Sequence, residues 1–482
     1  MPRHHTVHGR IVILGAGPCG LACADELNRL GFTDWLLLES APRPGGLGSS
    51  VTDPAGFTWD LGGHVVFSHF GEFDRLLSGL FTPGELLHHD RSSFIRYGDR
   101  WVPYPFQHHL HALPSGEAEA ALAGLLAARD ERGGTPADAA DFASWLHAMY
   151  GTALVEQFFA PYNTKVWATA LQEMAASWVA ERVAPVDVNA VLAAFQNPQA
   201  RAGTGRWGPN ATFAFPARGG TGEIWRRLAA RLDPSRVLTG AHVTGVDTRS
   251  GHIVLASGER LSYEHLVATG PLDELVAMTD DAPAEVRAAA RTLRHTTVAM
   301  VGLGYTAPTT DERSWLYFPQ PDIPFYRATN FSKYAPANVP ASDTASLCSW
   351  MTETAIPPDT HIDPSALARA CDQALRRCGL VPERAELASV HVEMIPYAYP
   401  VPTLGRDAAL DVIVPSMEMR GIHPRGRFGT WRYEIGNMDH AVKMGIDIAR
   451  HLVTGAREEL LHPTTTAPAS VSRSATGTRE AS

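Results

Sequence analysis

A glycine motif near the start of the chain restricts its fold more than any other feature. It reads GxGxxG and is formed by Gly15, Gly17 and Gly20. An apolar run over residues 10–14 precedes it, a helical pattern covers residues 19–30, and a second apolar run occupies residues 35–39. This order of strand, glycine turn, helix and strand predicts a βαβ unit, whose strands lie parallel in one sheet with a right-handed crossover.

The same motif predicts a dinucleotide site. Glycine is needed where the turn is tight and where the backbone must approach a pyrophosphate closely. The N-terminus of the following helix offers unpaired N–H groups and a favourable dipole to that anion. Glu39 ends the second strand and suits hydrogen bonding to a ribose hydroxyl. FAD and NAD are both open at this point.

Later glycine-bearing segments favour FAD. Residues 42–50 (PRPGGLGSS) follow the second strand, and residues 60–69 (DLGGHVVFSH) repeat the paired glycines. Such glycines let the backbone pass close to a flat ligand. Near the end, residues 426–429 (GRFG) and 434–441 (EIGNMDHA) open another helix, as in flavoproteins whose chain returns late to the cofactor. One such segment alone is typical of a loop, whereas the set predicts an FAD site.

Composition limits the partners. The chain has 482 residues, 45% hydrophobic and 19% charged, as in a globular protein of two or three domains. A net charge of -10 argues against nucleic acid, so an anionic substrate needs a local arginine cluster. The longest weakly polar run, residues 11–24, is short and broken by glycines, and no apolar leader precedes it, so we expect a cytoplasmic protein without a membrane partner. Five cysteines argue against a disulfide framework.

The rest of the chain alternates between helical and strand patterns. Helical patterns cover residues 114–194 and 436–452. Strands are expected at residues 242–247, 252–255, 265–268, 296–305, 347–354 and 390–396. The tail beyond residue 463 is rich in Ser, Thr and Ala and is expected to be disordered.

We therefore predict an α/β fold: a Rossmann-like FAD-binding domain with a helical insert domain and an antiparallel β-sheet domain. The FAD-binding domain is expected to take residues 1–95, 201–275 (where the sheet domain also starts) and 401–462. The insert takes residues 96–200, the sheet domain residues 276–400, and the tail residues 463–482. Within the sheet domain, residues 308–324 begin with polar residues and are bounded by prolines, so we expect a flap that closes over substrate.

Seven longer motifs extend over most of the chain. They read GGHVVFSH (62–69), WVPYPFQ (101–107), PYNTKVWA (161–168), WGPNATFAFPARGGTG (207–222), WLYFP (315–319), PFYRAT (324–329) and RGRFGTWRYEIGNMDH (425–440). With these motifs in matching order, residues 11–452 resemble the UDP-galactopyranose mutases, and specifically the eukaryotic-like branch found in fungi and parasites.

The resemblance implies an isomerase that interconverts the pyranose and furanose forms of a UDP-hexose, UDP-galactose in that family, with no net redox change. Reduced FAD is nevertheless required, because its N5 attacks the anomeric carbon as UDP leaves. The flavin–sugar adduct then opens to an iminium, the 4-hydroxyl of the sugar recloses the ring, and UDP returns. NAD(P)H is one candidate reductant of the flavin.

The resemblance also implies which residues handle charge. Arg327 and Arg427 match the arginines that hold the diphosphate, because planar, permanently charged guanidiniums suit that anion. The hydroxyls expected around them belong to Tyr334, Tyr399 and Tyr433. His64 matches the histidine beside the flavin, where we expect support of N5 rather than proton transfer. The residues expected to act in catalysis are His64, Arg182, Arg327 and Arg427.

The remaining matches concern the uridine, the hexose and the cofactor. The aromatic shelf for uracil is formed by Tyr104, Phe106, Phe158 and Tyr317, with Gln107 and Asn163 on the edge of the base and Tyr162 and Trp167 extending the wall. The hexose is expected near Arg182, Asn210 and Trp315. The residues expected to contact FAD are Gly15, Gly17, Pro18, Gly20, Glu39, Ser40, Gly46, Leu47, Gly62, Gly63, His64, Val243, Gly426, Gly436, Asn437 and Met438.

Other interpretations of the chain differ in chemistry. The same ring contraction could act on another nucleotide hexose, because the uridine-facing motifs are better preserved than anything that names the sugar. An amine or protoporphyrinogen oxidase would share the flavin fold, an NAD-dependent dehydrogenase would use the glycine motif without flavin, and a silent protein would bind the nucleotide sugar only. No metal site is predicted, since the histidines at 88–89 and 108–111 lack ligand spacing. The oligomeric state is left open.

Overall fold

The glycine motif lies in a five-stranded parallel sheet whose strands come from three distant parts of the chain. The computed structural model describes residues 9–132, 139–179, 182–197, 211–358 and 360–462. The strand order is β19-β13-β1-β2-β9, with bounds Ile422–Pro424, His265–Ala268, Ile11–Leu14, Trp35–Glu39 and Val237–Thr239. All neighbouring pairs are parallel. The predicted βαβ unit is confirmed, and β2 has the predicted bounds.

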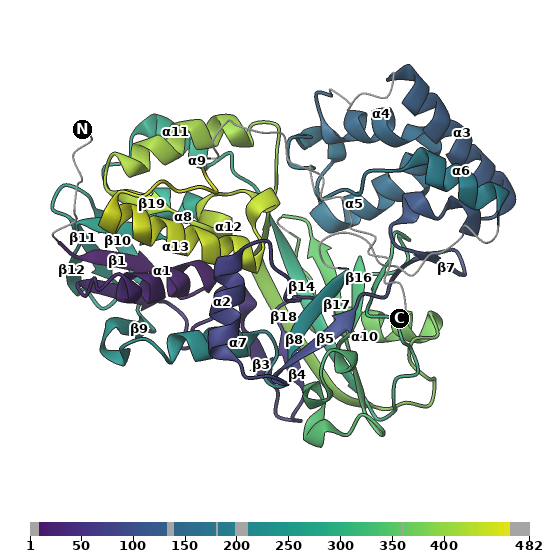
Figure 1. Cartoon of the computed structure of the whole chain (residues 1–482), viewed down its shortest axis with the longest axis horizontal. Coiled ribbons are helices and arrows are strands. Elements are labelled where there is room, and N and C mark those ends of the chain that lie inside the picture. The colour runs from purple at the N-terminus through teal and green to yellow at the C-terminus, as the bar shows by residue number, and fades with distance from the viewer. Residues whose placement is uncertain (1–8, 133–138, 180–181, 198–210, 359, 463–482) are drawn as a thin grey trace, which may run out of the picture.

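Both faces of the parallel sheet are covered. One face packs against α1 (Pro18–Arg29), α2 (Gly71–Leu80), α7 (Gly222–Ala229) and α13 (Met438–Thr454) (Figure 1). The other face packs against the antiparallel β10-β11-β12 (Val243–Asp247, His252–Leu255, Arg260–Ser262) and against α8 (Leu272–Met278), α9 (Ala284–Ala290) and α11 (Arg406–Glu418). Because side chains alternate along a strand, Ile11 and Ile13 enter the first core and Val12 enters the second.

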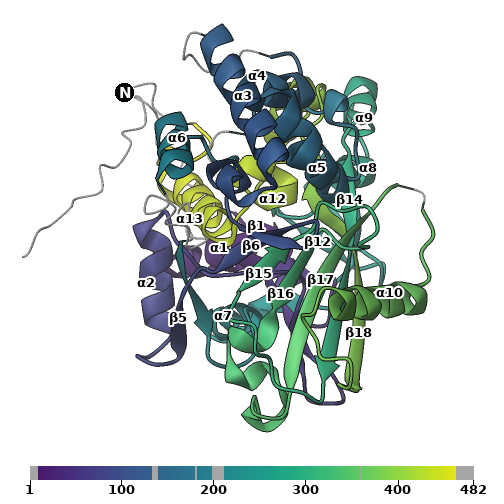
Figure 2. The ribbon, with the colours of Figure 1, turned by 90° about the vertical axis from the view of Figure 1, so that its right-hand side faces the viewer.

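A seven-stranded sheet forms the second unit. Its order is β18-β14-β17-β16-β15-β6-β7, with bounds Leu387–Pro400, His295–Tyr305, Cys348–Ile356, Arg327–Asn330, Trp315–Tyr317, Ser93–Tyr97 and Arg100–Pro103. Only the β15–β6 pair is parallel. α10 (Pro364–Arg377) packs on this sheet and lies beside β18 in Figure 2. Two short ladders, β3–β4 (Ser50–Thr52, Thr58–Asp60) and β5–β8 (Leu86–Asp90, Thr212–Pro216), complete the strand pairs.

The third unit is helical and stands apart from the parallel sheet in Figure 1. It contains α3 (Ser115–Glu131), α4 (Phe142–Leu154), a π-helical turn over Val155–Phe159, α5 (Ala160–Trp167) and α6 (Val188–Gln196). Their apolar side chains share one core with residues of the seven-stranded sheet, such as Ile95 in β6 and Val102 in β7. The predicted α/β fold class, with a helical insert and an antiparallel sheet beside the parallel sheet, is confirmed.

Two segments of the structure contain strands that the sequence did not indicate. Residue 96, where the helical insert is expected to begin, lies in β6, which pairs with β7 in the seven-stranded sheet. The segment 308–324, predicted as a flap, contains β15, which is paired on both sides. A strand of three residues is too short to show a period-2 pattern in sequence. The domain boundaries themselves stay predictions.

Two further expectations concern the C-terminal tail and membrane-spanning helices. The tail at 463–482 lies outside the described residues. Over the described part of the chain, no helix combines the length and the apolar composition that crossing a bilayer demands.

The close crossing of α1 and α13 depends on Gly445. A Cβ at this position would lie 2.2 Å from the carbonyl oxygen of Cys19, which is backbone and has no room to retreat. We predict that Gly445→Ala lowers the free energy of unfolding by about 1–3 kcal/mol, the usual cost of overpacking. Gly116→Ala in α3 is the matched control, because nothing lies within 4 Å of its Cβ. Urea titration of both variants measures the difference, and equal stabilities would contradict the crossing.

Candidate active site

A cavity of about 710 Å³ lies where the parallel sheet, the antiparallel sheet and the helical unit meet. The predicted residues that line it are Gly15, Gly17, Pro18, Glu39, Ser40, Gly46, Leu47, Gly62, Gly63, His64, Tyr104, Arg182, Trp315, Tyr317, Arg327, Tyr399, Gly426, Arg427, Tyr433, Gly436, Asn437 and Met438. One continuous space therefore connects the glycine motif with the arginines expected to bind diphosphate.

The N-terminus of α1 opens into this cavity. Gly17 is its N-cap and makes no side-chain hydrogen bond to the first turn, so the helical N–H groups stay available to a ligand. A Cβ on Gly20 would lie 1.9 Å from the carbonyl oxygen of Gly15, and one on Gly46 would lie 3.1 Å from the Cα of Gly17. These glycines are thus required by close backbone contacts, and they leave an anion site at the helix end.

Glu39 stands beside that anion site. Its carboxylate accepts hydrogen bonds from the backbone N–H of Ala16 at 2.7 Å and of Ala41 at 2.8 Å. These bonds fix the orientation of the carboxylate at the carboxyl end of β2, and its remaining lone pairs can accept ribose hydroxyls. The helix end and Glu39 together have the chemistry of a site for the adenosine half of a dinucleotide.

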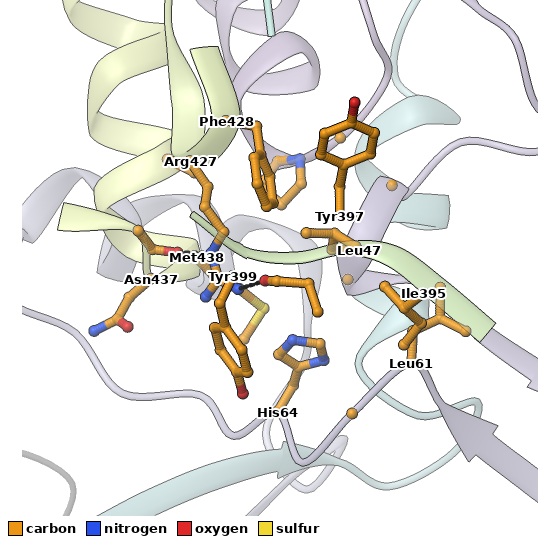
Figure 3. Close-up of a pocket in the computed structure, with 18 of the residues that line it drawn as sticks. Leu47, Leu61, His64, Ile395, Tyr397, Tyr399, Arg427, Phe428, Asn437 and Met438 are labelled. Atoms are coloured by element: carbon orange, nitrogen blue, oxygen red, sulfur yellow. Dashed lines mark hydrogen bonds between the residues drawn. The ribbon is translucent and has the colours of Figure 1, made fainter. Parts of the chain in front are cut away.

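The far half of the cavity suits a flat ring. Figure 3 shows Leu47, Leu61, Ile395, Tyr397 and Phe428 on one side, and His64, Tyr399, Arg427, Asn437 and Met438 on the other. α13 begins here, and its N-cap Asn437 makes no side-chain bond to the helix, so a second helix N-terminus faces the cavity. An apolar wall opposite a polar, helix-ended wall fits an isoalloxazine, and the donor set as a whole fits FAD.

His64 is held as a neutral imidazole. Its Nδ1 atom is buried and has no hydrogen-bond partner among the described residues. Burial, and next the nearby Arg427 guanidinium, lower the pKa of His64 to about 4. At neutral pH this ring is therefore uncharged, and it has a free nitrogen beside the place where the flavin fits.

Arg327 is oriented by an acidic residue that no motif indicated. Its Nε and Nη2 donate to the carboxylate of Glu353 at 2.8 and 2.6 Å, since β16 pairs with β17 in a register that sets the two residues opposite each other. Glu353 also accepts from the Tyr326 hydroxyl at 2.7 Å and from the Gly63 N–H at 2.9 Å. Although burial opposes it, Arg327 holds the pKa of Glu353 below its usual range. The one signal in the sequence was a glutamate within a buried strand.

Arg427 and Arg182 have no such counter-charge. Arg427 donates to the carbonyl oxygens of Gly436 at 2.8 Å and Ala398 at 3.0 Å, and burial lowers its pKa. Arg182 donates to the Asn437 side chain at 2.8 Å and to the Glu434 carbonyl at 2.7 Å. Within the described residues, neither guanidinium forms an ion pair with a carboxylate. Two cations held by neutral oxygens concentrate positive charge at this end of the cavity, which favours an anionic ligand there.

A wall of aromatic rings closes the cavity next to the helical unit. The rings of Tyr104 and Tyr317 lie 5.4 Å apart. The guanidinium of Arg91 lies over Tyr104 at 4.1 Å and over Trp315 at 4.7 Å, and it donates to the Tyr317 hydroxyl at 3.1 Å. Arg91 lines the cavity but was not predicted, because it lies outside the motifs that carry the resemblance.

Several predicted site residues lie outside the cavity lining. They are Gly20, Phe106, Gln107, Phe158, Tyr162, Asn163, Trp167, Val243 and Tyr334, and Asn210 falls outside the described residues. The rings of Phe106 and Phe158 stack on each other at 4.5 Å within the helical core. The Gln107 amide donates to the Ala184 carbonyl and the Asn163 amide to the Phe159 carbonyl, both at 2.8 Å. Their direct contacts with a base stay predictions.

A polar cluster borders the cavity at the start of α13. The carboxylate of Asp439 accepts from the ring nitrogens and the backbone N–H groups of both His69 and His440, at 2.7 to 3.1 Å. These three side chains have the composition of a metal site. The carboxylate oxygens of Asp439 thus already accept four hydrogen bonds from protein groups. The bonds from His69 tie the loop after His64 to α13.

These observations define a flavoprotein in which a dinucleotide-binding parallel sheet, an antiparallel sheet and a helical unit enclose one cavity. The profile of the family described as flavin containing amine oxidoreductase matches residues 18–453. A crystal structure described as reduced UDP-galactopyranose mutase is similar to this chain with 34% identity and a TM-score of 0.89, covering 95% of this chain and 96% of that chain. The chain belongs to the flavin containing amine oxidoreductase family, in the branch that includes UDP-galactopyranose mutase.

More distant structures share the fold alone. Cyclohexylamine oxidase from Brevibacterium oxydans IH-35A is 17% identical with a TM-score of 0.64, covering 94% of this chain and 100% of that chain. A fatty acid isomerase from P. acnes is 16% identical with a TM-score of 0.60, covering 92% of this chain and 98% of that chain. The predicted flavin cofactor and the resemblance to the mutases are confirmed.

The neutral state of His64 predicts a pH dependence of stability. In the unfolded chain His64 takes up a proton near its ordinary pKa, whereas in the folded chain it does so only near pH 4. Lowering the pH from 7.5 to 5 therefore favours unfolding, by about 2 kcal/mol for this residue. We expect His64→Asn to lose correspondingly less stability over that interval, as measured by urea titration. Equal losses in wild type and variant would show that His64 is protonated in the folded protein.

Proposed function

We propose that the protein is a flavin-dependent UDP-sugar mutase that interconverts UDP-galactopyranose and UDP-galactofuranose, with FAD in its reduced form and no net redox change. The observation that supports this most strongly is the pair of arginines without counter-charge, Arg427 and Arg182, on the same cavity as the dinucleotide site. A diphosphate is the anion that such a pair, together with Arg327, would bind through charge-assisted hydrogen bonds. The similar mutase structure gives the substrate class.

Reduced FAD, when bound, supplies an electron-rich N5 able to act on the anomeric carbon. Arg427 and Arg327 hold the diphosphate, so negative charge that develops as the sugar–phosphate bond weakens falls between fixed cations. Tyr399 and Tyr433 offer hydroxyls beside them. Holding the nucleotide in the cavity also allows its return to the rearranged sugar, because the diphosphate stays within reach of the anomeric carbon.

The aromatic wall is assigned to the uridine. Tyr104, Tyr317 and Trp315 line the cavity together, and they offer aromatic surface on which a planar base could stack. Phe106, Phe158, Gln107, Asn163 and Trp167 form the layer behind that wall. Asn210, through its motif, and Tyr334, through the resemblance to the mutases, also belong to the proposed site. His64 is given no proton to transfer, since its ring is neutral; its free Nδ1 suits support of the flavin.

Two alternatives differ from this proposal in substrate. A different nucleotide hexose would use the same arginines and the same chemistry. An amine or protoporphyrinogen oxidase would have an uncharged substrate, which would leave Arg427 and Arg182 without an anionic partner. NAD(P)H is the proposed reductant of the flavin, and the cytoplasm is the proposed compartment.

The central prediction is turnover without redox change. Protein reduced with dithionite is expected to convert UDP-galactofuranose to UDP-galactopyranose, whereas the air-oxidised protein does not. Anaerobic liquid chromatography of the nucleotide sugars measures this. Turnover of other UDP-hexoses alone would change the sugar in the proposal, and release of hydrogen peroxide with amines but no sugar turnover would replace the mutase with an oxidase.

The two arginines of the diphosphate site should fail differently. Arg427→Ala is expected to weaken UDP binding and lower kcat/KM by roughly 10²-fold while the free energy of unfolding is retained, since no carboxylate depends on this side chain. Arg327→Ala should lower both the UDP affinity and the free energy of unfolding, because it leaves Glu353 buried without its partner.

Calorimetric UDP titration and urea titration separate the two arginine effects. The control is Arg260→Ala in β12, where Arg260 forms an exposed ion pair with Asp247 of β10. Near-normal UDP affinity in Arg427→Ala would place the diphosphate elsewhere.

A further inference from the structure

Lys165 makes an unusual set of contacts for a lysine in a helix. Its ammonium donates to the backbone carbonyl oxygens of Phe318, Gln320, Ile323 and Phe325, each at 2.8 Å. An ammonium has three hydrogens, so at least one of them is shared between two oxygens. The four carbonyls belong to one loop, residues 318–326, and they converge on a single atom of α5.

The loop that Lys165 holds joins two strands of the proposed substrate wall. β15 precedes it and ends with Tyr317, and β16 follows it and begins with Arg327. Both of these residues line the cavity. The loop is closed at its base by the hydrogen bond from the Phe318 N–H to the Tyr326 carbonyl at 2.9 Å. A shift of the loop would therefore move the ring proposed for the base and the guanidinium proposed for the diphosphate together.

α5 contributes to the opposite side of the same wall. The ring of its Tyr162 lies 5.6 Å from that of Tyr317, and the ring of its Trp167 lies 4.8 Å from that of Tyr433. Lys165 stands between these two residues on the helix. Its four hydrogen bonds thus connect the helical unit to the seven-stranded sheet next to residues that line the cavity.

The use of lysine at this position is informative in itself. The chain contains 41 Lys and Arg residues, and lysine occurs only at positions 165, 333 and 443. A compact ammonium can serve several oxygens that converge on a point, whereas a planar guanidinium fork presents its donors in one plane. Lys165 also forms no ion pair within the described residues. Burial lowers its pKa to about 8, with a smaller opposing effect of Asp322, so the charged form is present at neutral pH.

We propose that Lys165 is a positioning residue of the substrate site: its ammonium ties α5 to the loop 318–326 and so sets Tyr317 and Arg327 in the geometry that binds the nucleotide. The inference rests on the proposed function, since it is the nucleotide that these two side chains would receive. Lys165 itself touches neither cofactor nor substrate. Its effect is on how tightly the nucleotide is held, rather than on the chemical step.

Substitution at Lys165 tests the inference on flavin-loaded protein. Lys165→Met is expected to raise the Kd of UDP and the KM of UDP-galactofuranose at least tenfold, with kcat within about threefold and the flavin content unchanged. The matched control is Arg377→Met, because Arg377 is an exposed cation that donates to the same loop, at the Asp322 carbonyl, through a single hydrogen bond of 3.2 Å. Its Kd and KM should stay within twofold of wild type. A Lys165→Met protein with wild-type Kd and KM would overturn the proposal, as would a variant that loses kcat alone.

A second pair of variants covers the case in which Lys165→Met does not fold. Lys165→Arg keeps the charge but reaches fewer of the four oxygens, and we expect its UDP affinity to fall at least fivefold. Lys165→Ala opens a carbonyl-lined space that ammonium ions can enter, so 100 mM ammonium chloride should restore part of its UDP affinity, whereas choline chloride at the same ionic strength should not. Wild-type affinity in Lys165→Arg, or equal effects of the two salts, would count against the positioning role.

Hydrogen exchange separates this inference from the proposed function. If the wild-type protein binds no UDP, the mutase proposal fails, and the role of Lys165 is judged by the exchange of the amides at 318–328. Exchange at least tenfold faster in Lys165→Arg than in wild type, with Arg377→Met unchanged, would support the tie between α5 and the loop. Unchanged exchange in Lys165→Arg would refute it.

Discussion

The organisation of the site depends on positive charge that the chain itself does not fully neutralise. Arg327 is matched by Glu353, but Arg427 and Arg182 are held by carbonyl and amide oxygens only. Enclosing a cation without a partner is unfavourable, so the surrounding dipoles must be fixed in place before a ligand arrives. The register of β16 on β17 and the start of α13 provide that fixed frame. The guanidiniums of Arg427 and Arg182, which have no carboxylate partner within the described residues, favour an anion at this end of the cavity.

Two sheets of different type supply the two halves of the cavity. The parallel sheet ends its strands at a helix N-terminus and at Glu39, which suits a pyrophosphate and a ribose. The antiparallel sheet brings Tyr317, Arg327 and Tyr399 from three strands to the same space. Neither half by itself could hold both a flavin and the proposed nucleotide sugar. The segment from β19 to α13 joins them, since it starts in the parallel sheet and carries Arg427 and Asn437 to the other half.

Local features were predictable, whereas long-range pairings were not. The βαβ unit, the bounds of β2 and the helical insert follow from periodicity and glycine spacing over short windows. Arg327 and Arg427 were found through motifs, but Glu353, Arg91 and Lys165 act through partners from other strands, helices or loops, and nothing adjacent marks them. Within the aromatic run at 101–107, Tyr104 lines the cavity, whereas Phe106 and Gln107 pack in the helical core. The sequence does not separate these two positions, because burying a large ring is the commoner use of such a run.

The tight crossing of α1 and α13 has a consequence for biosynthesis. The first strand and helix of the parallel sheet emerge from the ribosome early, but the helix that covers them and the strand β19 beside β13 are translated some four hundred residues later. Until then, the side of α1 that faces α13 has no partner, and the glycine loop has no second helix end opposite it. Cofactor insertion must therefore follow translation of α13, and the nascent N-terminal unit is exposed to chaperones for nearly the whole time of synthesis.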